Sequence, residues 1–435
     1  MELSNEQKNV LSAFRCGKNI FLTGPGGSGK TELIKYMVEL GKKDGKEVQV
    51  CALTGCAAVL LDCEGAKTVH SWAGIGLANA EIDDIIHKVA SSKHRRVPWI
   101  KADILIVDEV SMMSKKLFEL LSRIGQRIRR RPNVPFGGMQ VVFSGDFYQL
   151  PPVGSIEQPD TAAFCFESKD WKRTFNAIVQ LTTIFRQTDT SYSKILNQIR
   201  VGKLSRRSYT KLMDRVRTEK IETELKPTIL LPKRKDVDFI NTTELAKLET
   251  EEKTYHSTRA EDLPVPKSSY YMSQMADNCE REWKYLENNI MADQTLVLKV
   301  GAQVMCVANL DMEGPFPIVN GSQGIVTEFH KGLPMVQFND GQKRLIGEHT
   351  WVSESCPRIG VKQIPLIHAW AITIHKAQGV TLDLAEVDAG NNIFECGQTY
   401  VALSRVRALS GLYLTSFNPD KIKISRKVME FYNSL

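Results

Sequence analysis

The stretch at residues 24–31, Gly-Pro-Gly-Gly-Ser-Gly-Lys-Thr, constrains the fold of this chain more than any other. It matches the phosphate-binding pattern G-x-x-x-x-G-K-(S/T) at every fixed position. Residues 19–23 before it predict a short buried strand, and residues 32–40 after it predict a helix. Glycines let the loop amides face phosphate oxygens, and the helix N-terminus adds a positive dipole. The stretch therefore predicts an α/β domain with a nucleoside triphosphate site.

Each part of this loop has an expected role. Lys30 would reach the β- and γ-phosphates, and Thr31 would hold Mg²⁺. The residues expected around the triphosphate are Gly24, Pro25, Gly26, Gly27, Ser28, Gly29, Lys30 and Thr31. Upstream, Ser4 and Gln7 have the spacing of a helix capping box. The Gln7 amide could also donate to and accept from an adenine edge, and the sequence leaves both roles open.

The composition sets broad limits on the class of protein. A length of 435 residues exceeds what one hydrophobic core usually holds, so two or more domains are expected. The nine cysteines include no C-x-x-C pair, which favours reduced thiols. No apolar run reaches the roughly 20 residues that span a bilayer. We therefore expect an intracellular protein, cytoplasmic or nuclear and not secreted, with no membrane partner. The net charge of +7 favours a polyanionic partner only weakly.

A second anchor for the nucleotide site lies at residues 103–109. An apolar run typical of a buried parallel strand ends there in two adjacent carboxylates, Asp108 and Glu109. Open α/β sheets bind ligands at the carboxyl ends of their strands. Asp108 would hold Mg²⁺, usually through water, and Glu109 would polarise the attacking water.

A third strand, at residues 140–144, runs into Gly-Asp-Phe-Tyr-Gln-Leu-Pro-Pro-Val. Gln149 in this stretch can hydrogen-bond both a phosphate oxygen and a water molecule, which suits a sensor of the γ-phosphate. Pro151 and Pro152 restrict the backbone that follows.

Other residues could contact nucleic acid. Residues 48–53 predict a strand that is followed by small residues suited to a close backbone approach, and a histidine lies beside Trp72 farther on. That His–Trp pair could contact a phosphate and stack a base, although packing is the commoner role. Residues 78–101 predict a polar and basic surface excursion, either a solvated loop or a nucleic-acid contact. Residues 192–217 predict a pair of basic helices, which includes Arg200. The charges of this pair could be no more than a face exposed to solvent. The candidates in the first half of the chain are Thr54, Gly55, Ala57, His70 and Ser71.

Together, the phosphate loop, the strand ending in Asp108-Glu109-Val110-Ser111-Met112 and residues 135–153 resemble the PIF-family DNA helicases, superfamily 1 enzymes related to RecD. The resemblance implies an α/β fold with two RecA-like parallel-sheet motor domains and a small SH3-like β-barrel insertion. Residues 295–362 fit that insertion, because short apolar runs alternate there with Gly, Pro and Asn-Asp-Gly turns.

The resemblance also implies a domain organisation. Residues 1–180 would form the first motor domain, with a small accessory insertion at about 65–98. Residues 181–250 and 363–435 would form the second motor domain. Residues 251–362 would form the inserted accessory domain, with the SH3-like barrel at about 295–362.

Three later stretches resemble further motifs of the family, at residues 180–187, 374–382 and 400–407. The resemblance makes Arg186 and Arg405 candidate arginine fingers, whose guanidinium forks suit the oxygens of a γ-phosphate. It places Gln378 and Gly379 near the nucleotide phosphates. The residues it places near the DNA strand or the cleft are His375, Lys376 and Thr381.

The function implied is an ATP- and Mg²⁺-dependent DNA helicase that translocates 5′ to 3′ on single-stranded DNA. It would unwind duplexes, forks and other structures such as G-quadruplexes and RNA–DNA hybrids, with roles in replication, repair, recombination and telomere maintenance. A monomer is expected, with dimerisation on DNA as an alternative. Three other functions stay open: a DNA-stimulated ATPase that remodels protein–DNA complexes, an RNA helicase, and a non-catalytic DNA clamp.

Overall fold

The computed structural model describes residues 3–61, 63, 65–76, 78, 81–154, 158–187, 189–216, 226–264, 280, 283–284, 286–287, 290–310, 318, 320–339, 341–353 and 358–435. The chain forms two compact units. The first comprises Met1–Tyr209, Phe394–Ser404 and Pro419–Leu435, and the second comprises Thr210–Ile393 and Arg405–Asn418. None of the helices in the part of the chain so described is long and apolar enough to cross a membrane.

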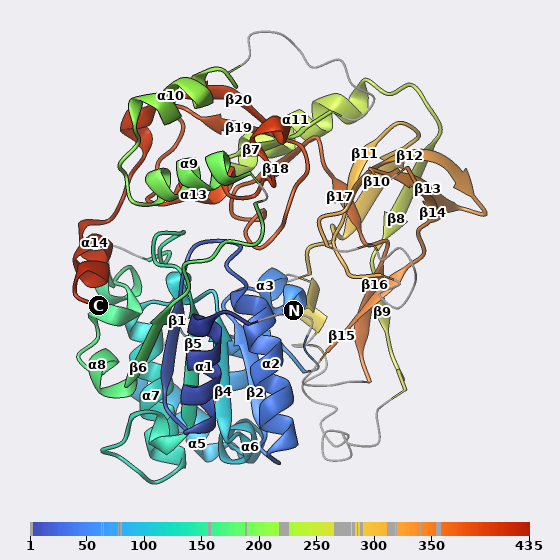
Figure 1. Ribbon diagram of the computed structural model, residues 1–435. Helices are drawn as coiled ribbons and strands as arrows, with labels where there is room; N and C mark the ends of the chain where they lie inside the picture. The colour runs from blue at the N-terminus through green and yellow to red at the C-terminus, as the bar shows by residue number, and fades with distance from the viewer. Residues whose placement is uncertain are drawn as a thin grey trace. The chain divides into compact units, whose positions relative to one another are not determined.

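The first unit is built on a parallel sheet of six strands in the order β3-β2-β4-β5-β1-β6 (Figure 1). The strands are β1 (Ile20–Thr23), β2 (Val48–Ala52), β3 (Lys67–Thr68), β4 (Ile104–Asp108), β5 (Gln140–Gly145) and β6 (Ala177–Gln180). The strands predicted before the phosphate loop, before the acid pair and before the sensor are confirmed to within one or two residues. Because all strands are parallel, their carboxyl ends meet at one edge of the sheet.

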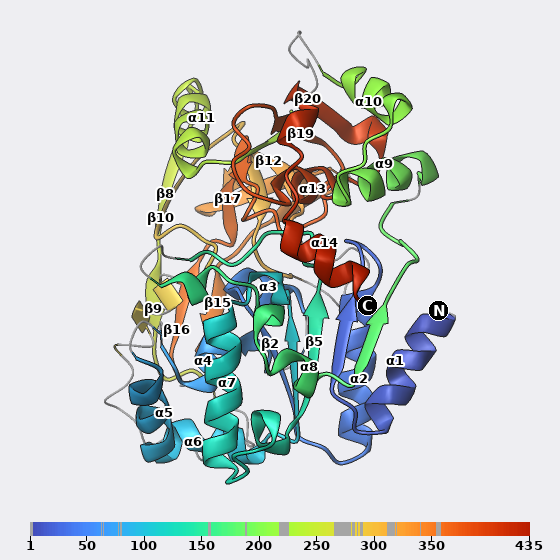
Figure 2. The ribbon, with the colours of Figure 1, turned by 90° about the vertical axis from the view of Figure 1, so that its left-hand side faces the viewer.

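Helices cover both faces of this sheet (Figure 2). α1 (Asn5–Arg15) and α2 (Lys30–Lys43) pack on one face, in a core that includes Phe14, Leu33 and Met37. The other face carries α7 (Lys115–Ile128), whose apolar side buries Phe118 and Leu121. The remaining helices that include residues of this unit are α3 (Gly55–Leu60), α4 (Val69–Ala73), α5 (Ile82–Ser91), α6 (Lys93–Lys101), α8 (Trp171–Thr174), α9 (Thr190–Arg200), α10 (Arg206–Met213), α13 (Gln398–Leu403) and α14 (Arg426–Asn433).

Residues 78–101 are not the solvated loop that was considered from the sequence. Where they are described, they form α5 and α6 and bury Ile85 and Val89 in the core beside α7. Trp99 of α6 is fully buried and lies 4.5 Å from Trp72, between ring centroids. Apolar residues at helical spacing therefore decide the structure of this segment, although most of its residues are polar. Residues 77, 79 and 80 of the predicted accessory insertion lie outside the described residues.

The C-terminal helix α14 packs on the core of the first unit. Val428 is buried there, and the ring of Phe431 stacks on Phe166 with centroids 4.4 Å apart. The sequence-based domain organisation placed this helix, and residues 181–209 and 394–404, with the second motor domain. The compact units divide the chain differently and group these segments with the first unit. The predicted domain limits stay a prediction.

The second unit contains a parallel sheet of four strands in the order β18-β7-β19-β20. The strands are β7 (Thr228–Leu231), β18 (Ala371–Thr373), β19 (Ala385–Ala389) and β20 (Leu412–Phe417). Helix α11 (Arg234–Ala246) follows β7 and contributes Val237 to the small core on this sheet. Two parallel sheets in one chain confirm the predicted architecture of two RecA-like motor folds.

The same unit holds the antiparallel part of the chain. A five-stranded sheet has the order β14-β13-β12-β11-β17. A smaller sheet pairs β10 with β8, and a three-stranded sheet has the order β15-β16-β9. The strands are β8 (Glu252–His256), β9 (Thr258–Ala260), β10 (Thr295–Lys299), β11 (Gln303–Cys306), β12 (Gln323–His330), β13 (Leu333–Phe338), β14 (Lys343–Leu345), β15 (His349–Val352), β16 (Gly360–Gln363) and β17 (Leu366–His368). This confirms the predicted β-rich insertion. Parts of the predicted inserted domain, including residues 265–279 and 311–317, lie outside the described residues.

The apolar run at residues 365–373 predicts a single buried strand from the sequence, and this prediction is wrong. β17 pairs antiparallel with β11 of the insertion, whereas β18 pairs parallel with β7 of the motor sheet. The change of partner occurs at Ala369 and Trp370. The Ala369 amide donates to the carbonyl of Gln303, and the carbonyl of Trp370 accepts from the amide of Ile229.

Candidate nucleotide site

The phosphate loop follows β1 at the carboxyl edge of the first sheet, and α2 begins at Lys30. Gly27 has a φ of +79°, in the left-handed region that glycine adopts most readily. The Lys30 ammonium donates to the carbonyls of Gly24 and Pro25, over 2.7 and 2.9 Å. Its positive charge therefore lies inside its own loop, where the phosphates of a bound nucleotide would come.

Acidic groups at two other strand ends of the sheet act on Lys30. Burial lowers the pKa of Lys30, and the carboxylates of Asp146, Glu109 and Asp108 oppose that shift. Asp146 follows β5, which is adjacent to β1, and Asp108 and Glu109 lie at the end of β4, which is adjacent to β5. The predicted convergence of the lysine and the acid pair on one edge is therefore present.

Asp108 is the residue best suited to bind a metal ion at this edge. Its side chain is buried, and burial together with the neighbouring Glu109 raises its pKa to about 6. A buried carboxylate beside a second acid is stabilised by a nearby cation. Oxygen ligands from Asp108 and Thr31, with several retained waters, are what Mg²⁺ accepts in proteins. The residues present thus fit a magnesium ion.

Glu109 has an uncommon backbone conformation. Its φ is +55° and its ψ is +39°, which lie in the left-handed region. Residues that carry a Cβ atom adopt this region much less readily than glycine does. Such conformations occur often at functional sites. The conformation turns the chain sharply between β4 and the following 3₁₀ helix at Val110–Met112.

The sensor candidate Gln149 lies on the loop that follows β5. It is buried, and its amide donates to the carbonyl of Asp146 over 2.9 Å. Among the described residues, neither its side-chain Oε1 nor the hydroxyl of Ser28 has a hydrogen-bond partner. Buried polar atoms are normally paired. Unpaired atoms in the phosphate loop and in the sensor are therefore consistent with a polar ligand between them.

Arg186 lies against the phosphate loop. The amides of Phe185 and Arg186 donate to the carbonyl of Gly27, over 2.8 and 3.3 Å. The Arg186 guanidinium donates to the carbonyl of Ser404 over 3.4 Å. All of these residues belong to the first unit.

Gln7 has a structural role at the start of α1. Its side-chain Oε1 accepts the Ser4 amide over 2.9 Å, which completes the predicted capping box. Its Nε2 lies next to Gly29, since a Cβ on that glycine would be 3.4 Å from it. The ring of Phe185 lies 3.5 Å from the same point and is 47% exposed. Sequence reasoning missed Phe185, although an aromatic residue directly before the candidate finger was a signal.

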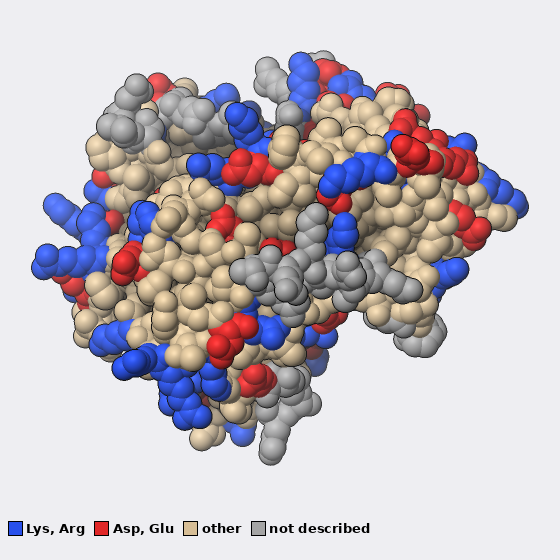
Figure 3. Space-filling model, turned by 90° about the horizontal axis from the view of Figure 1, so that it is seen from above, with Lys and Arg blue, Asp and Glu red and all other residues tan. Residues whose placement is uncertain are grey.

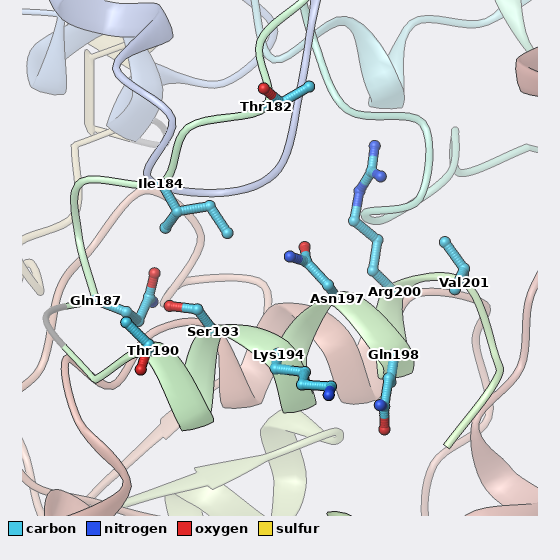
Figure 4. Close-up of a pocket in the computed structure, with 10 residues that line it drawn as sticks. All are labelled: Thr182, Ile184, Gln187, Thr190, Ser193, Lys194, Asn197, Gln198, Arg200 and Val201. Atoms are coloured by element: carbon cyan, nitrogen blue, oxygen red, sulfur yellow. The ribbon is translucent and has the colours of Figure 1, made fainter. Parts of the chain in front are cut away.

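Sequence reasoning also missed a buried ion pair beside the sensor. Arg200 makes two hydrogen bonds to the carboxylate of Asp146, both 2.8 Å long, and both side chains are buried. The prediction of a solvated face was therefore wrong for Arg200. Arg200 is one of the residues that line a hollow of about 680 Å³ along α9. In Figure 4, the side chains of Arg200 and Gln198 extend from opposite sides of this helix.

Tyr400, from the stretch at residues 400–407 that resembles a motif of the family, also contacts the phosphate loop. The Gly26 amide donates to its hydroxyl over 2.9 Å. Tyr400 lies on α13 in the first unit, whereas Arg405, the second candidate finger, is buried in the second unit. Gln378 and Gly379 also belong to the second unit. The roles of these three residues at the nucleotide stay predictions.

The nucleic-acid candidates of the first unit lie in short helices. The Thr54 hydroxyl accepts the amide of Ala57 over 3.2 Å and so caps α3, which begins at Gly55. Burial lowers the pKa of His70, and the Ser71 amide is bonded to the N-cap residue of α4. The neighbouring Trp72 is buried, so it is not available to stack on a base. The DNA contacts of the other candidates stay predictions.

The candidates of the second unit follow β18. His375 and Lys376 line a hollow of about 570 Å³ together with residues of α11 and β17. Its further lining includes Arg234, Asn241 and His368. Thr381 lies a few residues farther along the chain. Their contact with nucleic acid also stays a prediction.

Comparison with known proteins identifies relatives along the whole chain. The family model "PIF1-like helicase" matches residues 2–224, and the model "DNA helicase Pif1, 2B domain" matches residues 284–329. The ATP-dependent DNA helicase PIF1 of Danio rerio is 34% identical over 439 residues, which cover all of this chain and 64% of that protein. The ATP-dependent DNA helicase RRM3 of Saccharomyces cerevisiae is 31% identical and is 68% covered. The chain thus spans less than two thirds of the zebrafish protein's length.

Solved structures are similar over the full chain as well. Pif1 helicase from Candida albicans gives a TM-score of 0.78 at 34% identity, with 100% of this chain and 99% of that chain covered. Bacteroides sp Pif1 in complex with ADP-AlF4 gives 0.80 at 29% identity, with 100% and 97% covered. Bacteroides Pif1 bound to ssDNA gives 0.68, and two coordinating Pif1 helicases at forked dsDNA give 0.67, both at 30% identity with 100% and 97% covered. The geometry and the relatives agree: this chain belongs to the PIF1-like helicase family.

Proposed function

We propose that this protein is an ATP-dependent DNA helicase that moves 5′ to 3′ on single-stranded DNA and separates duplexes and forks. One observation carries the proposal: a phosphate loop, an acid pair, a buried glutamine sensor and an arginine lie together at the carboxyl edge of one parallel sheet. The relatives that match the whole chain are named ATP-dependent DNA helicases.

The chain's own residues divide the work of hydrolysis. Lys30 exchanges the carbonyls of its loop for the β- and γ-phosphate oxygens of ATP. Glu109 orients and polarises the attacking water, and Gln149 bonds both that water and the γ-phosphate. Arg186 stabilises the charge that develops in the transition state. Mg²⁺, held by Thr31 and Asp108, would neutralise phosphate charge when bound.

Gln7 and Phe185 supply an adenine pocket. The Oε1 atom of Gln7 accepts a hydrogen bond in the helix cap, and its Nε2 donates to the base. The exposed ring of Phe185 stacks on the base from the side of Gly29. Gln7 thus caps α1 with one side-chain atom and binds the base with the other.

Motion on DNA requires the second unit. Gln378, Gly379 and Arg405, which belong to that unit, act on ATP, and hydrolysis drives motion along the strand. Each fold grips the strand in turn. Thr54, Gly55, Ala57, His70 and Ser71 do so in the first unit, and His375, Lys376 and Thr381 in the second.

Charge supports a nucleic-acid partner without locating it. The chain has a net charge of +7. The face in Figure 3 carries lysines and arginines in several groups with acidic side chains between them. Forked DNA is the favoured substrate, because a related structure holds two coordinating Pif1 helicases at forked dsDNA. The protein is a monomer in solution, can pair on a fork, and acts inside the cell.

ATP hydrolysis measured with single-stranded DNA, with RNA and without nucleic acid tests this proposal. We expect strong stimulation by DNA and weak stimulation by RNA. Equal or greater stimulation by RNA would favour an RNA helicase. Stimulation by DNA without strand separation would favour an ATPase that remodels protein–DNA complexes. If the protein hydrolyses ATP under none of these conditions, a non-catalytic DNA clamp is the remaining alternative.

A further inference from the structure

A buried cluster lies behind the nucleotide site, centred on the carboxylate of Asp146. Arg200 binds this carboxylate through Nε and Nη2, each over 2.8 Å. The Asp146 side chain is fully buried, and 7% of the Arg200 side chain is exposed. Arg200 lies at the end of α9, one helix beyond the segment that carries Arg186 (Figure 4).

The third member of the cluster is Tyr432, from the C-terminal helix α14. Its hydroxyl accepts the Phe147 amide over 3.2 Å and donates to Asp146 Oδ1 over 3.3 Å. The same hydroxyl lies 2.6 Å from Oγ1 of Thr23. One phenol hydroxyl therefore joins the last residue of β1 to the loop that follows β5.

Aromatic contacts hold these polar groups in place. The rings of Tyr432 and Tyr148 stack, with centroids 4.7 Å apart and planes 11° from parallel. The Arg200 guanidinium lies 4.5 Å from the centroid of Tyr148 and 5.4 Å from that of Tyr432. A guanidinium between such rings gains cation–π attraction in addition to its ion pair.

The cluster contacts both walls of the nucleotide site. Thr23 directly precedes Gly24, the first residue of the phosphate loop. The carboxylate of Asp146 accepts the amide of Tyr148 over 3.2 Å, and its carbonyl accepts the amide of Gln149. The sensor and the phosphate loop are thus both tied to one buried ion pair.

Such an ion pair is a poor source of net stability. The cost of removing two charges from water often equals or exceeds their attraction, so a hydrophobic replacement can be neutral or stabilising. Its fixed, two-bond geometry does restrict the position of the loop around it. A role in positioning therefore explains the cluster better than a role in stability.

We propose that Asp146, Arg200 and Tyr432 form a positioning cluster that fixes Gln149 relative to the phosphate loop. The C-terminal helix is then required for the rate of ATP hydrolysis and not for ATP binding. This inference rests on the proposed ATPase function and adds to it three residues that act through Gln149. Their effect is on hydrolysis because the sensor acts on the water and the γ-phosphate, which must be aligned closely for reaction.

The test uses Tyr432→Phe and Arg200→Lys in the full chain, with single-stranded DNA present. Tyr432→Phe keeps the stacked ring and removes only the hydroxyl. Arg200→Lys keeps the charge and loses the two-bond geometry. The matched controls are Lys194→Gln, an exposed residue on the same helix, and Tyr36→Phe, a tyrosine that is 38% exposed on α2.

We expect kcat to fall about 10- to 100-fold in both cluster variants. The KM for ATP and the Kd for a fluorescent ADP analogue should stay within about twofold, since the loop that binds the phosphates is unchanged. Both controls should behave as the wild type. Unchanged kcat in Tyr432→Phe and Arg200→Lys would overturn the inference. A parallel loss of kcat and ADP affinity with a lower Tm would also overturn it, because it would show a merely structural cluster.

The outcome separates this inference from the proposed function. If the wild-type chain hydrolyses no ATP with DNA, the proposed function fails and no variant needs to be compared. If the wild type hydrolyses ATP and the cluster variants equal it, only the positioning role fails.

Discussion

Gly27 and Arg186 are packed so closely that a Cβ atom on Gly27 would lie 2.3 Å from the Cβ of Arg186. Separations under 3.0 Å are essentially never seen for real Cβ atoms. The carbonyl of Gly27 also accepts the amides of Phe185 and Arg186. The phosphate loop and the segment bearing the candidate finger thus form one surface.

Gly27→Ala should therefore displace Arg186. We expect kcat for ATP hydrolysis to fall about 100-fold, because the finger no longer reaches the γ-phosphate. Gly17→Ala is the matched control, since Gly17 also has a positive φ, +68°, but nothing lies within 4 Å of its added Cβ. Equal losses of kcat in the two variants would point to backbone strain and not to contact with Arg186.

Arg186→Ala should slow hydrolysis far more than it weakens nucleotide binding. A finger acts on charge that develops in the transition state, so a loss of about 1,000-fold in kcat is expected. The Kd for ADP should change less than about threefold. Comparable losses in kcat and in ADP affinity would identify a structural arginine.

Asp108→Asn should stabilise the metal-free protein while it removes Mg²⁺-dependent ATPase activity. Burial and Glu109 raise the pKa of Asp108 from 3.8 to about 6. Between these pH values the folded protein retains a proton that the unfolded chain has lost, so the native carboxyl costs stability as pH rises. The full cost is present above pH 6, on the order of 1 to 3 kcal/mol.

Thermal unfolding in EDTA checks this prediction. The Tm of Asp108→Asn should exceed that of the wild type at pH 7.5, and the difference should vanish near pH 4. Asp84→Asn, at an exposed position on α5, serves as the control. A lower Tm for Asp108→Asn at pH 7.5 would mean that the carboxylate is compensated in the free protein.

His368→Gln should reduce the acid sensitivity of the fold. Burial lowers the pKa of His368 from 6.5, and the ring Nε2 is bonded to the carbonyl of Val297 over 2.8 Å. The unfolded chain binds a proton that the native ring resists, so stability is lost as pH falls below 6.5. The drop in Tm between pH 7 and pH 5 should be smaller in the variant. His87→Gln, at an exposed position on α5, should leave that drop unchanged.

The nucleotide-binding edge could be predicted from the sequence because its parts are local. Lys30 follows one buried strand, Asp108 ends a second, and Gln149 comes after a third. Parallel strands bring such ends to one edge whatever the loops between them do. Short motifs at strand ends were therefore sufficient to predict that these residues meet at one edge of the sheet.

The positioning cluster could not be predicted in the same way. Asp146 and Arg200 are 54 positions apart, and Tyr432 lies 286 positions beyond Asp146. Nothing in the local pattern around Arg200 separates this buried arginine from Lys194, the exposed basic residue of the same helix. Only its tertiary partner, the carboxylate after β5, makes its burial favourable.

The pairing partners of the strands also could not be predicted from the sequence. The residues of β17 and β18 are apolar alike, and only long-range hydrogen bonds assign one to the insertion and the other to the motor sheet. The C-terminal helix has an ordinary apolar face. In the structure, Phe431 and Val428 of this face pack on the core of the first unit. Hydrophobic periodicity predicts that a face is buried but does not name the surface that buries it.

Lys30→Ala should abolish ATP hydrolysis and leave binding of single-stranded DNA largely intact. Lys30 lies within its own loop at the nucleotide site, so its loss removes phosphate contacts and nothing from the proposed DNA surfaces. Fluorescence anisotropy with labelled DNA measures the binding. ATPase activity near that of the wild type would contradict the assignment of the site.

Strand separation on tailed duplexes tests the central claim most directly. The wild type and Lys30→Ala are compared on duplexes that carry a 5′ or a 3′ single-stranded tail, with ATP and Mg²⁺. We expect that the wild type unwinds the 5′-tailed duplex, that it leaves the 3′-tailed duplex paired, and that Lys30→Ala unwinds neither. Unwinding by Lys30→Ala, unwinding from the 3′ tail alone, or no unwinding by a wild type that hydrolyses ATP would contradict this claim.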